Sequence, residues 1–309
     1  MAVRKAPAPM LALLAAAALA GCGAEQDGPA DVAGGEKRTR IDDPGPIHVH
    51  GLGVNPRDGA LFLASHTGLF RAGPGELTVK RVGDRFQDTM GFTVVGRDRF
   101  LGSGHPDGRD RLPPFLGLIE SRDAGRSWTP VSLLGKRDFH VLEARGKRVY
   151  GFGSNFKTRD QALVVSDDGG RSWRQRRTPE TGRRASETER RAPETLTSLA
   201  IDRRRPDRVV ASGGWLHTST NAGRSWRPLP GDPGLLAWPS VDRLYRVGAD
   251  GRVSVSRDAG RGWRAVGAVG GEPAAFLGHA ARDLYVALHD GTIKRSTDGG
   301  ASWSIRSRP

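Results

Sequence analysis

Residues 166–173 read Ser-Asp-Asp-Gly-Gly-Arg-Ser-Trp, and four more copies of this phrase share its pattern, Ser-x-Asp-x-Gly-x-x-Trp. One copy has Asn221 in place of the Asp. The copies occupy residues 121–128, 166–173, 219–226, 256–263 and 296–303. Their starts lie 37 to 53 residues apart, and a repeat of this period is typical of a solenoid, a propeller or an array.

Each position of the phrase has a structural explanation. Alternating apolar runs flank the copies, so the phrase is predicted to form the turn between two strands. The Asp carboxylate, or the Asn amide oxygen, can accept hydrogen bonds from nearby backbone N–H groups. Gly permits a positive φ, and Trp buries a large ring at the start of the next strand. The residues with this predicted structural role are Asp123, Asp168, Asn221, Asp258, Asp298, Trp128, Trp173, Trp226, Trp263 and Trp303.

The phrase resembles the Asp-box, or bacterial neuraminidase repeat, from about residue 48 to residue 307. The chain is thus similar to Asp-box β-propellers, which include sialidases, sortilin-type receptors, photosystem assembly factors and bacterial lipoproteins labelled glycosyl hydrolase. The resemblance implies an all-β fold of four-stranded antiparallel blades, with a box turn between the third and fourth strands. It does not fix an activity, because one fold hosts many functions.

Counting strands back from each phrase predicts a six-bladed β-propeller in residues 48–309. The first unit has the rhythm of a blade, but its phrase has decayed to Ala72-Gly-Pro-Gly75. The predicted blades cover about residues 48–83, 86–134, 138–178, 194–230, 234–268 and 272–307. A seventh blade from residues 22–47 is the less favoured alternative, because that stretch is too short for four strands.

The N-terminus predicts export. Arg4 and Lys5 precede a short apolar run from Met10 to Ala20, which is typical of a secretory signal. The following Leu19-Ala-Gly-Cys22 resembles a bacterial lipobox. The resemblance implies a lipoprotein signal peptide over residues 1–21 and a lipidated Cys22. The alternative is an ordinary cleaved signal with a chance cysteine.

Residues 22–47 are rich in Gly, Asp, Pro and Ala and predict a flexible tether. We therefore expect the protein on the outer face of the bacterial cytoplasmic membrane, or on another extracytoplasmic membrane surface, attached through Cys22. Its net charge of +14 is compatible with nucleic-acid binding, but export argues against that partner. We expect a monomer, with an exported protein or a glycan as the candidate partner.

The strand register brings histidines to the face opposite the phrases. His48 and His50 begin the first strand of blade 1, and His66 ends its second strand. His105 follows the second strand of blade 2, and His289 ends that of blade 6. Neutral imidazoles that converge near a carboxylate can bind Cu or Zn. The alternative is a set of polar residues that line a wet channel.

The leading functional hypothesis is a binding module for a ligand, a metal or a protein, without sialidase activity. Sialidases carry a Phe/Tyr-Arg-Ile-Pro motif and a Tyr nucleophile, whereas the nearest match here is Phe70-Arg-Ala-Gly73. All three tyrosines fall at equivalent second-strand positions, which predicts a core role. The alternative is a secreted glycoside hydrolase that uses carboxylates on the channel face, with Asp88, Asp107 and Asp110 as candidates. A third hypothesis is an assembly factor for another exported protein.

Overall fold

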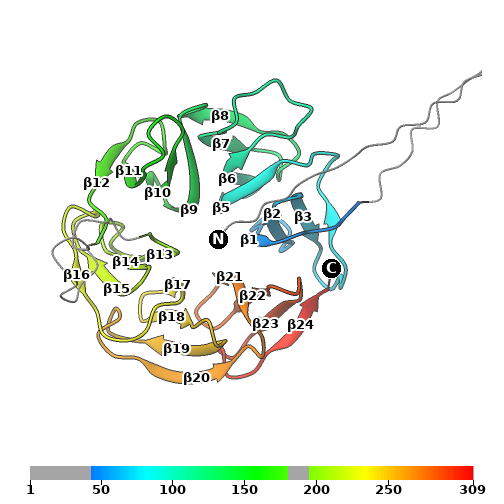
Figure 1. Cartoon of the computed structure of the whole chain (residues 1–309). Coiled ribbons are helices and arrows are strands. Elements are labelled where there is room, and N and C mark those ends of the chain that lie inside the picture. Colours follow the sequence, from blue (N-terminus) through cyan, green and yellow to red (C-terminus); the bar gives the residue numbers. More distant parts are fainter. Residues whose placement is uncertain (1–42, 180–194, 309) are drawn as a thin grey trace, which may run out of the picture. The chain divides into compact units, whose positions relative to one another are not determined.

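The computed structural model describes residues 43–179 and 195–308. These residues form six four-stranded antiparallel sheets arranged in a ring (Figure 1), so the prediction of an all-β, six-bladed propeller is confirmed. Each blade is one continuous stretch of chain, with its strands in sequence order. Within the described ranges, no helix has the length and apolar character needed to cross a membrane. The predicted signal peptide, Cys22 and residues 22–42 of the predicted tether lie outside the described residues.

The first strand of each blade lines the central channel, and the fourth lies at the rim (Figure 1). Blade 1 contains β1 (Val49–Val54), β2 (Leu61–Ser65), β3 (Gly68–Ala72) and β4 (Lys80–Arg81). Blade 2 contains β5 (Asp88–Gly96), β6 (Arg99–His105), β7 (Leu118–Ser121) and β8 (Thr129–Ser132). Blade 3 contains β9 (Arg137–Arg145), β10 (Arg148–Asn155), β11 (Gln161–Ser166) and β12 (Arg174–Arg176).

The inner strands of the remaining blades have four to six residues. Blade 4 contains β13 (Ser198–Ile201), β14 (Val209–Ser212), β15 (Leu216–Ser219) and β16 (Arg227–Pro228). Blade 5 contains β17 (Leu235–Ser240), β18 (Arg243–Val247), β19 (Arg252–Ser256) and β20 (Arg264–Ala268). Blade 6 contains β21 (Pro273–Gly278), β22 (Leu284–Leu288), β23 (Ile293–Ser296) and β24 (Ser304–Ser307).

The hydrophobic core is divided among the interfaces between neighbouring blades, with one cluster at each interface. Buried residues follow one another along strands such as β2. Successive side chains point to opposite faces, so Leu61 and Leu63 join one interface cluster and Phe62 and Ala64 join the other. Two buried tyrosines also cross an interface by hydrogen bonds. The Tyr150 hydroxyl donates to the Pro206 carbonyl at 2.7 Å, and the Tyr245 hydroxyl donates to the Ala281 carbonyl at 2.9 Å. The predicted core role of these tyrosines agrees with their burial.

The ring is closed where blade 6 meets the decayed phrase of blade 1. The Arg308 N–H donates to the Leu77 carbonyl at 3.1 Å, and the Ser307 hydroxyl donates to the same oxygen at 2.7 Å. The Arg306 guanidinium donates to the Gly73 carbonyl at 2.6 Å. The segment that lost the repeated phrase therefore supplies backbone acceptors for the last strand.

The repeated turns share one hydrogen-bond pattern. In the first copy, the Gly125 N–H donates to the Ser121 hydroxyl at 2.8 Å, and the Ser127 N–H donates to the Asp123 carboxylate at 2.9 Å. Asn221 accepts from the Ser225 N–H in the same way at 3.0 Å, as expected for an amide oxygen. The five Trp rings are half-buried rather than fully buried, and they pack at the edges of the interface clusters.

Candidate functional site

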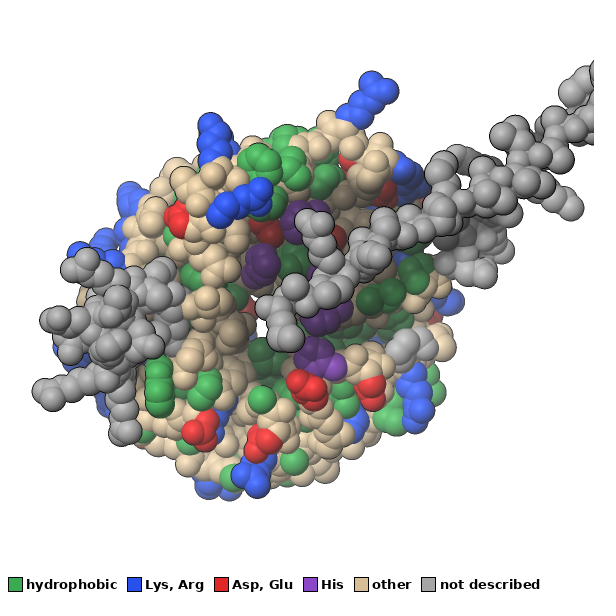
Figure 2. Space-filling view, in the orientation of Figure 1, with side chains coloured by type: hydrophobic (Ala, Val, Ile, Leu, Met, Phe, Trp, Pro, Cys, Tyr) green, Lys and Arg blue, Asp and Glu red, His purple; other side chains and the backbone are tan. Residues whose placement is uncertain are grey.

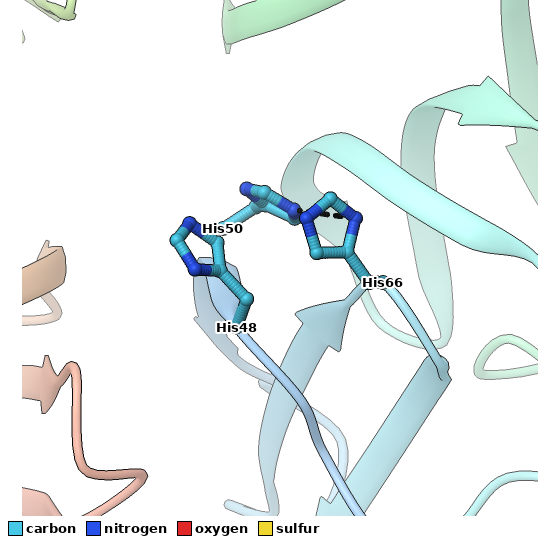
Figure 3. Close-up of side chains that lie close together, drawn as sticks. All are labelled: His48, His50 and His66. Carbon is cyan, nitrogen blue, oxygen red and sulfur yellow. Dashed lines mark hydrogen bonds between the residues drawn. The ribbon is translucent and has the colours of Figure 1, made fainter. Parts of the chain in front are cut away.

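Three histidines of blade 1 lie together at one end of the channel. His48 immediately precedes β1, His50 lies within β1, and His66 follows β2. Antiparallel pairing of β1 with β2 places the start of one strand beside the end of the other, with Val49 opposite Ser65. His48 has a φ of 53°, an uncommon conformation for a residue with a Cβ. Figure 3 shows the three side chains converging from these neighbouring segments.

The distances within this trio suit a shared ligand. One ring nitrogen of each histidine lies within 4.8 Å of those of the other two. His50 Nε2 lies 3.3 Å from His66 Nδ1 (Figure 3). His289, which follows β22 in blade 6, extends the group, because its ring centroid lies 5.4 Å from that of His48. The histidine side chains gather around the central opening in Figure 2.

Asp88, the first residue of β5, joins the trio to His105 of blade 2. Its Oδ1 lies 3.0 Å from His66 Nδ1, and its Oδ2 lies 3.1 Å from His105 Nδ1. Burial opposes ionisation of this carboxyl, but the hydrogen bonds with His105 and His66 outweigh it, so the pKa of Asp88 lies below its usual value. The hydrogen bond between Asp88 and His105 also raises the pKa of His105. Asp88 therefore acts as an orienting carboxylate for two imidazoles.

Burial lowers the pKa of two members of the trio, His50 and His48, and so favours their neutral form. Burial, with added repulsion from His66, lowers the pKa of His50 to about 4. Burial also lowers the pKa of His48, with smaller contributions from His66 and His289. A neutral imidazole keeps one nitrogen lone pair, which is the form that binds a metal ion.

Asp138 continues the cluster into blade 3, and the sequence predictions did not include it. Its Oδ2 lies 2.9 Å from His140 Nε2 and 3.8 Å from His105 Nε2. The side chain is buried, and its Oδ1 has no hydrogen-bond partner among the described residues. A signal was present in the sequence, because strand alternation places residues 138 and 140 on one face. Asp138 is the second residue of β9, and Asp88 is the first residue of β5.

The other two predicted carboxylates hold the loop after β6. Asp107 accepts from the Phe86 N–H at 2.8 Å and from the Arg109 guanidinium at 2.6 Å. The hydrogen bond from Arg109 places the pKa of Asp107 far below its usual range. Asp110 pairs with Arg85. These contacts give both side chains a structural explanation, and neither has a histidine among its described partners.

The central channel contains a cavity with a volume of about 430 Å³. His50 and His140 lie in its lining, as do Glu143 and Arg145 farther along β9. Burial raises the pKa of Glu143 to about 8, although the side chain is only partly shielded from solvent in the channel. The sequence predictions did not include this residue, although strand alternation places residues 141, 143 and 145 on one face of β9.

Replacing Glu143 with Gln is expected to remove one pH-dependent loss of stability. The folded protein holds a proton on Glu143 up to about pH 8, whereas an unperturbed glutamate releases it near 4.5. The contribution of this proton to the free energy of unfolding is therefore complete below about pH 4.5, and it falls as the pH rises towards 8. Because channel solvent reduces the effect, we expect Glu143→Gln to be more stable than wild type by about 2 kcal/mol at about pH 9 and nearly equal at about pH 4. Urea unfolding at both pH values measures the difference, and an equal gain at both would contradict it.

No protein-family model and no curated protein sequence matches the chain. Solved structures do match its fold. YCF48 from Cyanidioschyzon merolae is 14% identical with a TM-score of 0.52, and the match covers 85% of this chain and 86% of that one. A gluconolactonase from Xanthomonas campestris is 14% identical with a TM-score of 0.57, over 78% and 83% of the two chains.

A GH74 xyloglucanase from Xanthomonas campestris is 18% identical with a TM-score of 0.52. The match covers 84% of this chain but only 45% of the xyloglucanase. Identities this low concern the fold alone, since one fold carries many activities. The chain is therefore similar in fold to β-propellers whose own activities differ from one another.

Proposed function

We propose that this protein is an exported Asp-box β-propeller that binds a divalent transition-metal ion at His48, His50 and His66. The observation that carries the proposal is the convergence of three imidazole nitrogens within 4.8 Å of one another. Export and membrane attachment through Cys22 rest on the N-terminal sequence.

The donor set favours zinc or copper. Imidazole nitrogen is a common ligand of both metals, whereas calcium and magnesium prefer oxygen. Three histidines with one open position are typical of sites that bind a further ligand at the metal. His289 stands beside His48 as a candidate fourth ligand. Asp88 would orient His66 from the second layer through its 3.0 Å contact, as carboxylates do around zinc-bound histidines.

A glycoside hydrolase is the alternative with less support. Ordinary glycosidases need two carboxyl groups about 5 to 10 Å apart. Among the described residues that line the channel cavity, Glu143 is the single carboxylate. Asp88 is engaged by two histidines, and Asp107 by an arginine and backbone. These contacts favour binding over hydrolysis.

Calorimetric titration of the purified full chain with Zn²⁺ and with Cu²⁺ near neutral pH tests the proposal. We expect one ion per chain, and no binding at that site in the triple variant His48→Ala/His50→Ala/His66→Ala. The control is His279→Ala, because His279 is exposed and its described ring neighbour is Tyr285 rather than a cluster histidine. A wild-type chain that binds neither ion would refute the metal site. Membrane fractionation of a Cys22→Ala variant tests the anchor separately.

A further inference from the structure

A second concave site lies on the face of the repeated turns, between blades 3 and 4. Its volume is about 730 Å³. The β9–β10 turn, the β13–β14 turn and the repeated turns of blades 3, 4 and 5 contribute its lining. The cationic lining residues are Arg145, Lys147, Arg148, Arg205, Arg208 and Arg261. Arg145 lines both this groove and the channel cavity. It lies five residues from His140 on β9, or about 17 Å along an extended strand, so the groove lies away from the histidines.

The acidic residues of the groove are already neutralised. Arg148 forms ion pairs with both Asp167 and Asp207, which are the two carboxylates in the lining. Arg174 adds a second partner to Asp167 at 2.6 Å. The two carboxylates of the groove are therefore not available to neutralise the positive charge of its other cations.

Four cations of the groove have no partner among the residues that the structure describes. The side chains of Arg145, Lys147, Arg205 and Arg261 form no hydrogen bond or ion pair with any residue in the described ranges. Arg203 lines the channel cavity and not the groove; burial lowers its pKa, and repulsion from Arg145 lowers the pKa further. Like charges gathered in a concave surface create a positive potential that attracts anions.

The backbone at two of these cations, Arg205 and Lys147, is fixed before any ligand arrives. The fully buried Asp202 accepts hydrogen bonds from the N–H groups of Arg204 and Arg205, at 2.7 Å and 3.2 Å, and from Arg208 Nε at 2.5 Å. Lys147 lies in the tight turn at Gly146, which has a φ of 59°. A fixed backbone reduces the ordering cost of binding, which separates this groove from a freely solvated run of charges.

We propose that this groove binds a soluble ligand with a chain of linked phosphates. Guanidinium groups bind phosphate oxygens through paired hydrogen bonds, and four unpaired cations can match the charge of a short oligophosphate. A concave site lined by residues of five turns suits a soluble ligand, whereas a bilayer presents a flat surface.

Tripolyphosphate is the probe for calorimetric titration of the full chain in metal-free buffer. We expect saturable binding, weakened at least about tenfold in Arg145→Gln/Lys147→Gln/Arg205→Gln. The matched control is Arg126→Gln/Arg171→Gln/Arg224→Gln, which removes the same charge from exposed residues at one repeated position outside the groove. It should change the affinity less than about twofold.

Two results would overturn the proposal: no binding by wild type, or equal weakening in both triple variants, which would mean attraction to overall charge. The single variant Lys147→Glu, on an exposed turn residue, provides a milder test if the triple variant does not fold. Binding to vesicles of phosphatidylglycerol is measured with the same variants. Groove-dependent binding to these vesicles without binding to tripolyphosphate would replace the soluble ligand with a lipid surface.

Discussion

A His50→Ala variant is expected to bind Zn²⁺ at least about 100-fold more weakly than the wild-type chain. His50 is the half-buried member of the trio. Its Nε2 lies 3.3 Å from His66 Nδ1, and its ring, tilted by 52° to that of His48, has its centroid 4.9 Å away from the His48 centroid. Its loss leaves two exposed imidazoles, which lose the third ligand and the neighbour that fixes their spacing. Competition with a chromophoric chelator measures the change in affinity.

Asp88→Asn should produce a smaller loss of about tenfold. The amide keeps the size of the side chain but removes the charge that orients His66 and His105, and removal of such an outer partner typically costs 10- to 100-fold. The ordered series of wild type, Asp88→Asn and His50→Ala separates a ligand from an orienting residue. If His50→Ala bound as tightly as the His279→Ala control, the metal would lie elsewhere.

The sequence predicted the fold because the repeated turns act as fixed points for the strand register. Once a turn is placed, period-two alternation assigns every residue of the two flanking strands. This reasoning placed His66 and His289 at the ends of β2 and β22, where they lie in the structure. It also placed the decayed phrase, residues 72–75, at the outer part of blade 1.

The details of the site depend on irregularities that alternation does not encode. β1 has a register shift between Val49 and Gly51, and β10 has one opposite β9 between Phe152 and Gly153. Each bulge re-aims the residues beside it, and the positive φ of His48 changes its direction again. Residues 43–47, predicted as the end of the tether, contact blade 1, where the Thr67 hydroxyl donates to the Gly45 carbonyl at 2.5 Å.

The identity of ion-pair partners also lies beyond sequence patterns. Asp107 and Asp110 have the same residue type and the same predicted face as Asp88, yet arginines bind them. Arg109 of the same loop binds Asp107, and Arg85, which precedes β5, binds Asp110. The groove shows the opposite case, in which a cation has no carboxylate partner although carboxylates lie nearby. Arg148 takes both nearby carboxylates and leaves Lys147, its neighbour in the chain, without one. Such choices depend on three-dimensional distances between turns of different blades.

Gly104→Ala is expected to destabilise the protein by about 3 kcal/mol and to weaken the histidine site with it. A Cβ at this position would lie 2.0 Å from the Asp88 carbonyl oxygen and 3.0 Å from the Met90 nitrogen. Both are backbone atoms, so no side-chain rotation can relieve the overlap. The φ of Gly104 is 142°, which L-residues rarely adopt. Gly153 has the same relation to Asp138 in blade 3, with a distance of 1.8 Å.

The two glycines therefore allow the strands that carry Asp88 and Asp138 to approach the ends of β6 and β10. An alanine at 104 must push the start of β5 away, and Asp88 would move from His66 and His105. Gly108→Ala is the matched control in the following loop, because a Cβ there meets no atom within 4 Å. We expect that control to change the free energy of unfolding by less than about 0.5 kcal/mol. Urea unfolding and Zn²⁺ titration of both variants test the argument, and equal stability of the two would show that β5 can relax without cost.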